Sequence, residues 1–464
     1  MNETGFLSPG FPSPGFPSPA PLRSAASEHT PLLHRPSRGT LRRRVSTVTV
    51  QPTRPPGRST FRQTLFNACA LLLGIGMLSE PLAFSYAGWI GGTALMVFYG
   101  YLTCYTAKFL ARITITDPTV RSYADIGLKA FGARSASIVS VIFCLEIFTL
   151  SVILETLYAD SLHAVLPALS SNTYKLISFV FLIPGVFLPL SALSYTSLTG
   201  ILSTICLVLV IFIDGLSKTE APGSLIDPAK TSLLPDSWKE LGMAFGLFMA
   251  GFGAHAAMPS IVEDMAEPDR FEEAMNYSFG FATLFYSLIG MAGYLMFGND
   301  VSEEVSQNLL GVPGYSKGLN QLVLWMLVLS SLTKFPLALR PLNVTLEIIM
   351  GLDTLRDPHS IEHAKSDHGY EASTKTFSTR FGKRILFIAE RSFFVFFAVI
   401  VSIFLPDFGA MMAILGAFTT FLLCIIGPLA AKMSLEGFNM RDSLFLVIAV
   451  PMAVWGTTVA FMPM

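Results

Sequence analysis

The stretch LLLGIGMLSEPLAFSYAGW, residues 71–89, interrupts the first long apolar run of the chain with Gly74, Gly76 and Pro81. Glycine and proline are the two residues that weaken a helix most. An apolar helix that carries all three so close together either tolerates a defect or uses it. The rest of the sequence distinguishes between these two explanations.

The composition is that of a membrane protein. The chain has 464 residues, of which 52% are hydrophobic and only 14% are charged, whereas a soluble domain carries about 25% charged residues. From Phe61 onward, long apolar runs alternate with short polar ones. The cysteines lie inside these runs without a Cys-x-x-Cys pair, so we expect free buried thiols and no disulfide framework, metal site or cofactor. The sequence therefore predicts an all-α, polytopic membrane protein.

About eleven apolar runs reach the roughly 20 residues that a membrane-spanning helix needs. They lie near 62–84, 88–111, 135–158, 174–192, 196–216, 239–259, 276–297, 319–347, 384–405, 408–431 and 443–462. We therefore expect a transmembrane domain over 61–464.

The first 60 residues differ from the rest of the chain. They are polar, rich in proline and of low complexity, so we expect a disordered tail over 1–60. Arginine is frequent in this tail and acidic residues are rare, and the positive-inside rule places such a segment in the cytosol. An odd number of spans then leaves the C-terminus on the lumenal side.

The tail also contains a short sorting pattern. Residues 28–33 read EHTPLL, and Glu28 with Leu32 and Leu33 fits an acidic dileucine signal. An exposed apolar pair in a disordered tail has no folding role and suits capture by a sorting adaptor.

A second stretch, GLFMAGFGAHAAMP at residues 246–259, repeats the pattern of the first. A Gly-x-Gly precedes Pro81 in the first span, and another precedes Pro259 in the sixth. If spans one to five and six to ten are two repeats, these interruptions hold corresponding positions, which is the best sequence indication of a transporter binding site. The alternative is that these are packing glycines in ordinary spans, but the matched pair favours the binding site.

Unwound backbone inside a membrane is costly unless it lines a cavity. A half-helix N-terminus offers N–H groups and a positive dipole end to a carboxylate, and a half-helix C-terminus offers carbonyls to an ammonium or a cation. Two broken helices can therefore hold the head group of an amino acid with backbone groups alone. The predicted substrate-binding residues are Gly74, Ile75, Gly76, Met77, Gly251, Phe252, Gly253 and Ala254.

GIGMLSEPLAFSYAGW resembles the first-helix signature of the amino acid/auxin permease family of the APC superfamily. Segment 245–279 resembles the sixth-helix region of that family, KFPLALRPL its eighth helix and segment 406–432 its tenth. The chain is most similar to the vacuolar amino acid transporters of that family. Over about residues 61–462, this resemblance implies eleven helices, the first ten forming two inverted repeats of the LeuT-like fold. Glu80 departs from the pattern, because an apolar or small residue is expected there.

Ionisable residues at membrane depth are costly and usually functional. Lys334 lies in the eighth span beside Ser331, in a cluster that resembles the hydroxyl groups holding sodium between helices one and eight in related transporters. The lysine could replace that sodium, or it could snorkel to the interface. Glu146 lies deep in the third span and could face the cavity, whereas Glu155 is expected near the interface.

Three further residues are candidates for ion or proton coupling. His255 directly follows the sixth-span interruption, but a lone histidine is often only a hydrogen-bonded core residue. Glu80 could contact substrate or proton, or could face a polar cavity without a role. Asn67 precedes the first interruption and could equally bond to a neighbouring helix.

Together these features favour a secondary active transporter of neutral amino acids, driven by the proton gradient across a vacuolar or lysosomal membrane. Its expected partners are the amino acid, protons, the lipid bilayer and a sorting adaptor, and no nucleic acid.

The sequence shows no phosphate loop, nucleophile constellation or metal-spaced His/Cys group, so it supports neither an enzyme nor an ATP-driven pump. An amino acid sensor of the same fold that signals through its tail is the alternative. A channel is disfavoured because no filter motif or acidic ring is present.

Overall fold

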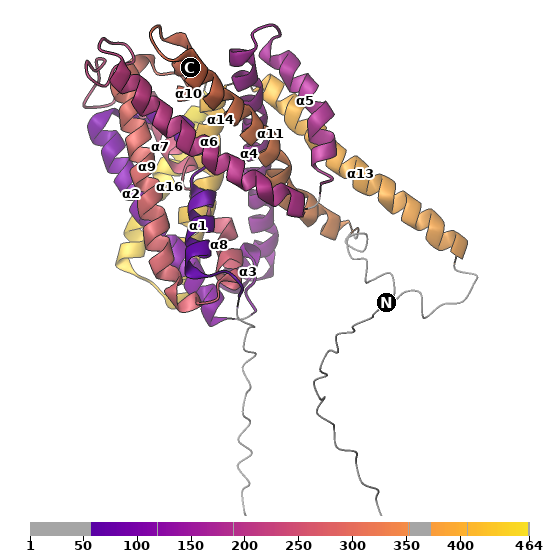
Figure 1. Ribbon diagram of the computed structural model, residues 1–464. Coiled ribbons are helices and arrows are strands. Elements are labelled where there is room, and N and C mark those ends of the chain that lie inside the picture. Colours follow the sequence, from indigo (N-terminus) through magenta and orange to yellow (C-terminus); the bar gives the residue numbers. More distant parts are fainter. Residues whose placement is uncertain are drawn as a thin grey trace, which may run out of the picture. The chain divides into compact units, whose positions relative to one another are not determined.

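A computed structural model describes residues 57–117, 119–188, 190–350, 352, 373–405 and 407–462. Within them the chain forms helices joined by loops, with one isolated β-bridge between Ser59 and Met265 (Figure 1). The expected sorting signal at Glu28, Leu32 and Leu33 lies outside the described residues.

The first span is broken where the sequence predicts. α1 (Phe61–Leu72) is followed by a short 3-10 helix, η1 (Ile75–Leu78), and then by α2 (Glu80–Thr116). Pro81 lies in the first turn of α2, where its missing N–H costs no hydrogen bond. α2 contains the end of the first span and all of the second, which meet at a kink at Gly88, where φ is +67°. Glycine reaches that conformation without steric cost.

The sixth span is broken in the same way. α7 (Trp238–Ala250) is followed by an irregular stretch, by the 3-10 helix η2 (His255–Ala257) and by α8 (Met258–Asp264). Pro259 lies in the first turn of α8, just as Pro81 does in α2. Both interruptions predicted from the glycines and prolines are confirmed.

The remaining helices complete the bundle. They are α3 (Tyr123–Phe131), α4 (Ala133–Val165), α5 (Ser171–Gly185), α6 (Leu190–Ser217), η3 (Pro268–Arg270), α9 (Phe271–Phe297), η4 (Gly298–Asp300), α10 (Val305–Gly311), α11 (Lys317–Ile349), α13 (Ser373–Phe404), α14 (Phe408–Ile414), η7 (Leu415–Thr420), η8 (Leu422–Ile426), α15 (Gly427–Glu436) and α16 (Met440–Ala460). The stretches η7 and η8 are π-helical, a conformation that often marks functional sites.

The chain is a polytopic, all-α membrane protein. In the part of it that the structure describes, nine helices are long and apolar enough to cross a membrane. Each of the eleven expected spans contains a helix, but two do not meet that criterion. The first is divided by its interruption, and the fourth, expected over 174–192, is only α5, which ends at Gly185. That expected boundary was wrong.

Helices five spans apart pack against each other. α2 packs on α9, α4 packs on α11, and the first span contacts both halves of the sixth (Figure 1). Packing of counterpart helices is consistent with two repeats related by an axis that passes between them. The core is apolar and aromatic between these pairs, and Phe84 meets Phe248 edge to face with ring centroids 5.1 Å apart.

Candidate functional site

The two interruptions cross at Gly76 and Gly251. A Cβ atom on Gly76 would lie 2.5 Å from the Cα atom of Gly251, closer than real side chains approach. Glycine permits such close approach of two backbones. Packing therefore accounts for Gly76, whether or not its backbone also meets a ligand.

Gly74 and Gly253 lie in more open surroundings. The nearest atom to a Cβ on Gly74 would be the Leu72 carbonyl oxygen at 3.9 Å, and a Cβ on Gly253 would lie 3.4 Å from the Thr420 side chain. These are ordinary contacts, so packing does not require glycine at either position. Glycine at these positions is consistent with exposed backbone and with the break of the helix itself.

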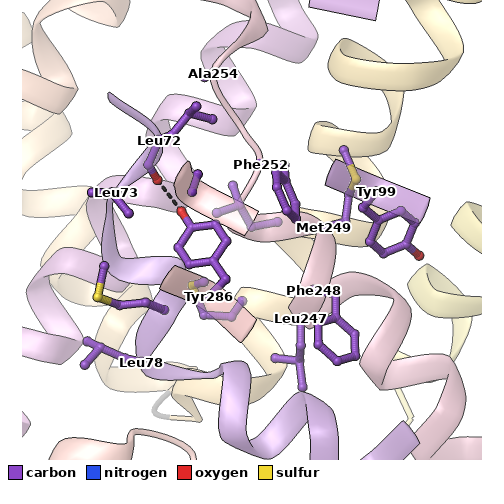
Figure 2. Close-up of a cluster of buried hydrophobic side chains, with 14 of the residues drawn as sticks. Leu72, Leu73, Leu78, Tyr99, Leu247, Phe248, Met249, Phe252, Ala254 and Tyr286 are labelled. Atoms are coloured by element: carbon purple, nitrogen blue, oxygen red, sulfur yellow. Dashed lines mark hydrogen bonds between the residues drawn. The ribbon is translucent and has the colours of Figure 1, made fainter. Parts of the chain in front are cut away.

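A small pocket lies beside the first interruption. Its volume is about 20 Å³, which is room for about one water molecule. Its lining comes from η1, α4, α6 and α11: Gly74, Ile75, Met77, Leu78, Leu154, Leu157, Ser203, Thr204, Leu207, Leu327, Ser330, Ser331 and Lys334. Three predicted binding residues are thus brought together with two predicted coupling residues. Phe252 and Ala254 do not line this pocket and are buried in the apolar core (Figure 2).

Lys334 reaches across from α11 to α6. A Cβ on Gly200 would collide with Cε of Lys334 and would lie 2.7 Å from its Nζ, so the ammonium rests directly against the α6 backbone. This placement between two helices argues against snorkelling. Within the described residues, no acidic side chain forms a salt bridge with it.

The hydroxyl groups around Lys334 form an acceptor-rich surface. Ser203 and Thr204 donate to the Gly200 carbonyl at 2.8 and 3.0 Å, and Ser331 donates to the Leu327 carbonyl at 2.8 Å. Because each hydroxyl proton is directed at a carbonyl, each oxygen keeps its lone pairs for another donor. A positive charge is the natural occupant of such a site.

Glu146 reaches the sixth-span interruption indirectly. Its Oε1 accepts a hydrogen bond from the Thr420 hydroxyl at 3.2 Å, and Thr420 is the π-helical residue that lies against Gly253. Glu155 was expected near the interface, and α4 continues past it to Val165. Glu155 is buried and accepts a hydrogen bond from the Ser178 hydroxyl at 2.7 Å.

His255 holds the sixth-span interruption to its neighbours. Its Nε2 lies 3.0 Å from the Thr103 carbonyl and 2.9 Å from the Thr106 hydroxyl. A carbonyl can only accept, so Nε2 carries the proton. Thr106 also donates to the Cys424 carbonyl at 2.7 Å. This geometry favours a structural histidine that joins η2 to the second and tenth spans.

The other two candidates lie outside this pocket. Asn67 lines a separate cavity of about 230 Å³ between α1 and α8. Glu80 is fully buried and lies against Gly251, next to Tyr286 of α9. Nothing in the sequence distinguishes Tyr286, Thr420 or Gly200 from other residues of the apolar runs, because their roles depend on which helices meet.

Comparisons with known proteins agree with this architecture. Residues 57–462 match the family described as transmembrane amino acid transporter protein. The amino acid transporter AVT1B of Arabidopsis thaliana is 30% identical over 388 residues, which cover 81% of this chain and 65% of the relative. AVT1D of the same plant is 27% identical over 404 residues, covering 84% of this chain and 66% of the relative. The chain thus spans just under two thirds of these relatives, both named as transporters and not as enzymes.

One solved structure supports the fold alone. The inward-facing conformation of Mhp1 superposes with a TM-score of 0.52 and 11% sequence identity, covering 89% of this chain and 91% of the other. At that identity the likeness concerns the arrangement of helices and not the ligand.

Proposed function

This chain belongs to the family of transmembrane amino acid transporter proteins, and from that premise we propose that it is a secondary active transporter of neutral amino acids driven by a proton gradient. The observation that carries this proposal is the position of Lys334. Its side chain borders a pocket that combines the first interruption with the hydroxyl groups of α6 and α11.

The two interruptions supply the proposed substrate site. Half-helix ends offer carbonyls to the ammonium of an amino acid and N–H groups to its carboxylate. The open surroundings of Gly74 and Gly253 leave backbone available on both broken spans. An uncharged side chain would need no further charged partner, which is why we propose neutral substrates.

Lys334 supplies the proposed coupling. The Lys334 ammonium borders the pocket that η1, α6 and α11 line. A positive charge there would hold η1 to the hydroxyl groups of α6 and α11, and loss of the proton would remove that attraction. Lysine is suited to this because burial changes its proton affinity readily. The expected result is transport that follows the proton gradient and is indifferent to sodium.

The function is tested by uptake of a panel of radiolabelled amino acids into proteoliposomes that carry an imposed pH gradient. We expect neutral amino acids to accumulate with the gradient, and we expect this accumulation to collapse when an ionophore dissipates the gradient. Binding without any flux would instead favour the amino acid sensor.

We further propose that the protein resides in the membrane of an acidic, vacuole-like compartment, with its N-terminus cytosolic and its C-terminus lumenal. The resemblance to vacuolar transporters and the arginine-rich tail support this placement. We expect a sorting adaptor to bind the tail through Glu28, Leu32 and Leu33.

Replacing Leu32 and Leu33 together by alanine is expected to move the protein toward the cell surface. The EHTPLL pattern acts as a sorting signal and takes no part in the substrate site. Uptake by the purified variant should therefore equal that of the wild type. Imaging of a fluorescently tagged variant measures the shift, and Leu22→Ala in the same tail is the control. Unchanged localisation would mean that EHTPLL is a chance match.

A further inference from the structure

Tyr286 of α9 joins the two interruptions through one hydroxyl group. The side chain is fully buried, and its hydroxyl contacts the carbonyl of Leu72 (Figure 2). The same hydroxyl also donates to the carbonyl of Gly251 at 2.8 Å. Phe252 packs edge to face on the same ring, with centroids 5.4 Å apart. Tyr286 therefore contacts the end of α1 and the end of α7 at once.

Both carbonyls lie at helix C-termini. Leu72 is the last residue of α1 and Gly251 is the C-cap of α7, so each end carries the negative pole of a helix dipole and carbonyls without helical partners. The Leu72 carbonyl already accepts a hydrogen bond from the Gly74 N–H at 2.8 Å, and the tyrosine hydroxyl has a single proton for the two carbonyls. Acceptors therefore outnumber donors where the broken helices meet.

Glu80 adds two further acceptors to this point. Its side chain is fully buried, and within the described residues neither carboxyl oxygen has a hydrogen-bond partner. Oε1 of Glu80 would lie 3.0 Å from a Cβ atom on Gly251. The Cβ atom of Glu80 packs against Gly290 of α9. Glu80 lies at the N-terminus of α2, where the helix dipole favours a carboxylate. However, no backbone N–H group of α2 donates a hydrogen bond to these two oxygens.

The surroundings of Glu80 do not support a charge. Among the described residues, Tyr286 is the titratable group that faces it from α9, and no basic side chain faces it from α7. An ionised carboxylate buried among apolar groups and helix C-termini, with no donor, is too costly to persist. The uncharged acid removes that cost and adds one O–H donor to a group of acceptors.

We propose that protonated Glu80 and Tyr286 form a pin that holds the two interruptions together, and that proton loss from Glu80 releases it. When water reaches the side chain, the carboxyl O–H bond breaks, the proton passes to water and the carboxylate remains, and α1 and α7 are then free to separate. The use of this pin in the transport cycle rests on the proton coupling proposed above. It is distinct from Lys334, which lies on the α4, α6 and α11 side of the first interruption.

Glu80→Gln tests the pin on the purified protein without substrate, because glutamine copies the shape of the uncharged acid. We expect both proteins to unfold at the same temperature at acidic pH. As the pH rises and Glu80 ionises, the wild type should fall below the variant by about 2 °C or more. The infrared band of a protonated carboxyl group should also be weaker in the variant. A difference in unfolding temperature that does not change with pH, or an unaltered band, would overturn the proposal.

Tyr286→Phe tests the other half of the pin. Tyr99→Phe is the matched control, because Tyr99 is equally buried and its hydroxyl has no partner among the described residues. We expect Tyr286→Phe to lower the unfolding temperature by about 2–4 °C relative to Tyr99→Phe, with the pH dependence retained. Equal effects of the two variants would remove Tyr286 from the pin. Absence of gradient-driven uptake by the wild type would refute the proposed coupling alone, since none of these measurements uses transport.

Discussion

Lys334→Ala is expected to abolish accumulation against a gradient while substrate exchange continues. A difference of one pH unit is worth about 1.4 kcal/mol, or tenfold in concentration for each coupled proton. A wild-type carrier that couples one proton should therefore accumulate substrate about tenfold under that gradient, and the variant should reach no more than the outside concentration. Exchange survives because the proposed binding by the two interruptions does not use the lysine.

The measurement is uptake into proteoliposomes with an imposed pH gradient, with and without sodium, alongside counterflow without a gradient. Lys317→Ala is the control, since Lys317 begins the same helix and is exposed. If the Lys334 variant follows the gradient as the wild type does, the lysine has no coupling role, and Glu146 and then His255 are next to be tested. A requirement for sodium in the wild type would refute the proton assignment altogether.

Gly76→Val is expected to lower transport by at least about 100-fold, because small misplacements of a preorganised site have effects of that size. The first atom of any side chain at Gly76 would meet the Gly251 backbone at 2.5 Å. Neither backbone can move aside without displacing its half-helix, so the crossing of the interruptions is lost. Counterflow of the best wild-type substrate measures the effect, and size-exclusion chromatography shows whether the variant is still assembled.

Gly280→Val is the matched control for that variant. Gly280 lies in α9, and a Cβ there would meet nothing within 4 Å, so transport should be retained. Normal transport by Gly76→Val would refute the crossing. Gly253→Ala then separates packing from ligand contact, because its Cβ has only ordinary contacts. Loss of substrate affinity in that variant would indicate that the Gly253 backbone meets the substrate, as the sequence predicts.

The fold class and the two interruptions were predictable from the sequence. Hydropathy marks a membrane helix within a window of about 20 residues, and glycine and proline act on the turn that contains them. These are local properties, so the breaks near Gly74 and Gly251 and the prolines that restart each helix needed no knowledge of neighbouring helices. Helix ends were less certain, as α2 and α5 show, because packing decides how far a helix extends.

Only the tertiary structure decided which residues meet. Lys334 and Gly200, Gly76 and Gly251, and Tyr286 and Leu72 are contacts between different helices. The rotation and tilt of each helix are set by packing against its neighbours, and no local pattern in a uniformly apolar run records them. The sequence thus determined where the helices break and which ionisable groups enter the membrane. The packing of the helices determined that Lys334 borders the pocket beside the first break and that Glu80 faces Tyr286 on its other side.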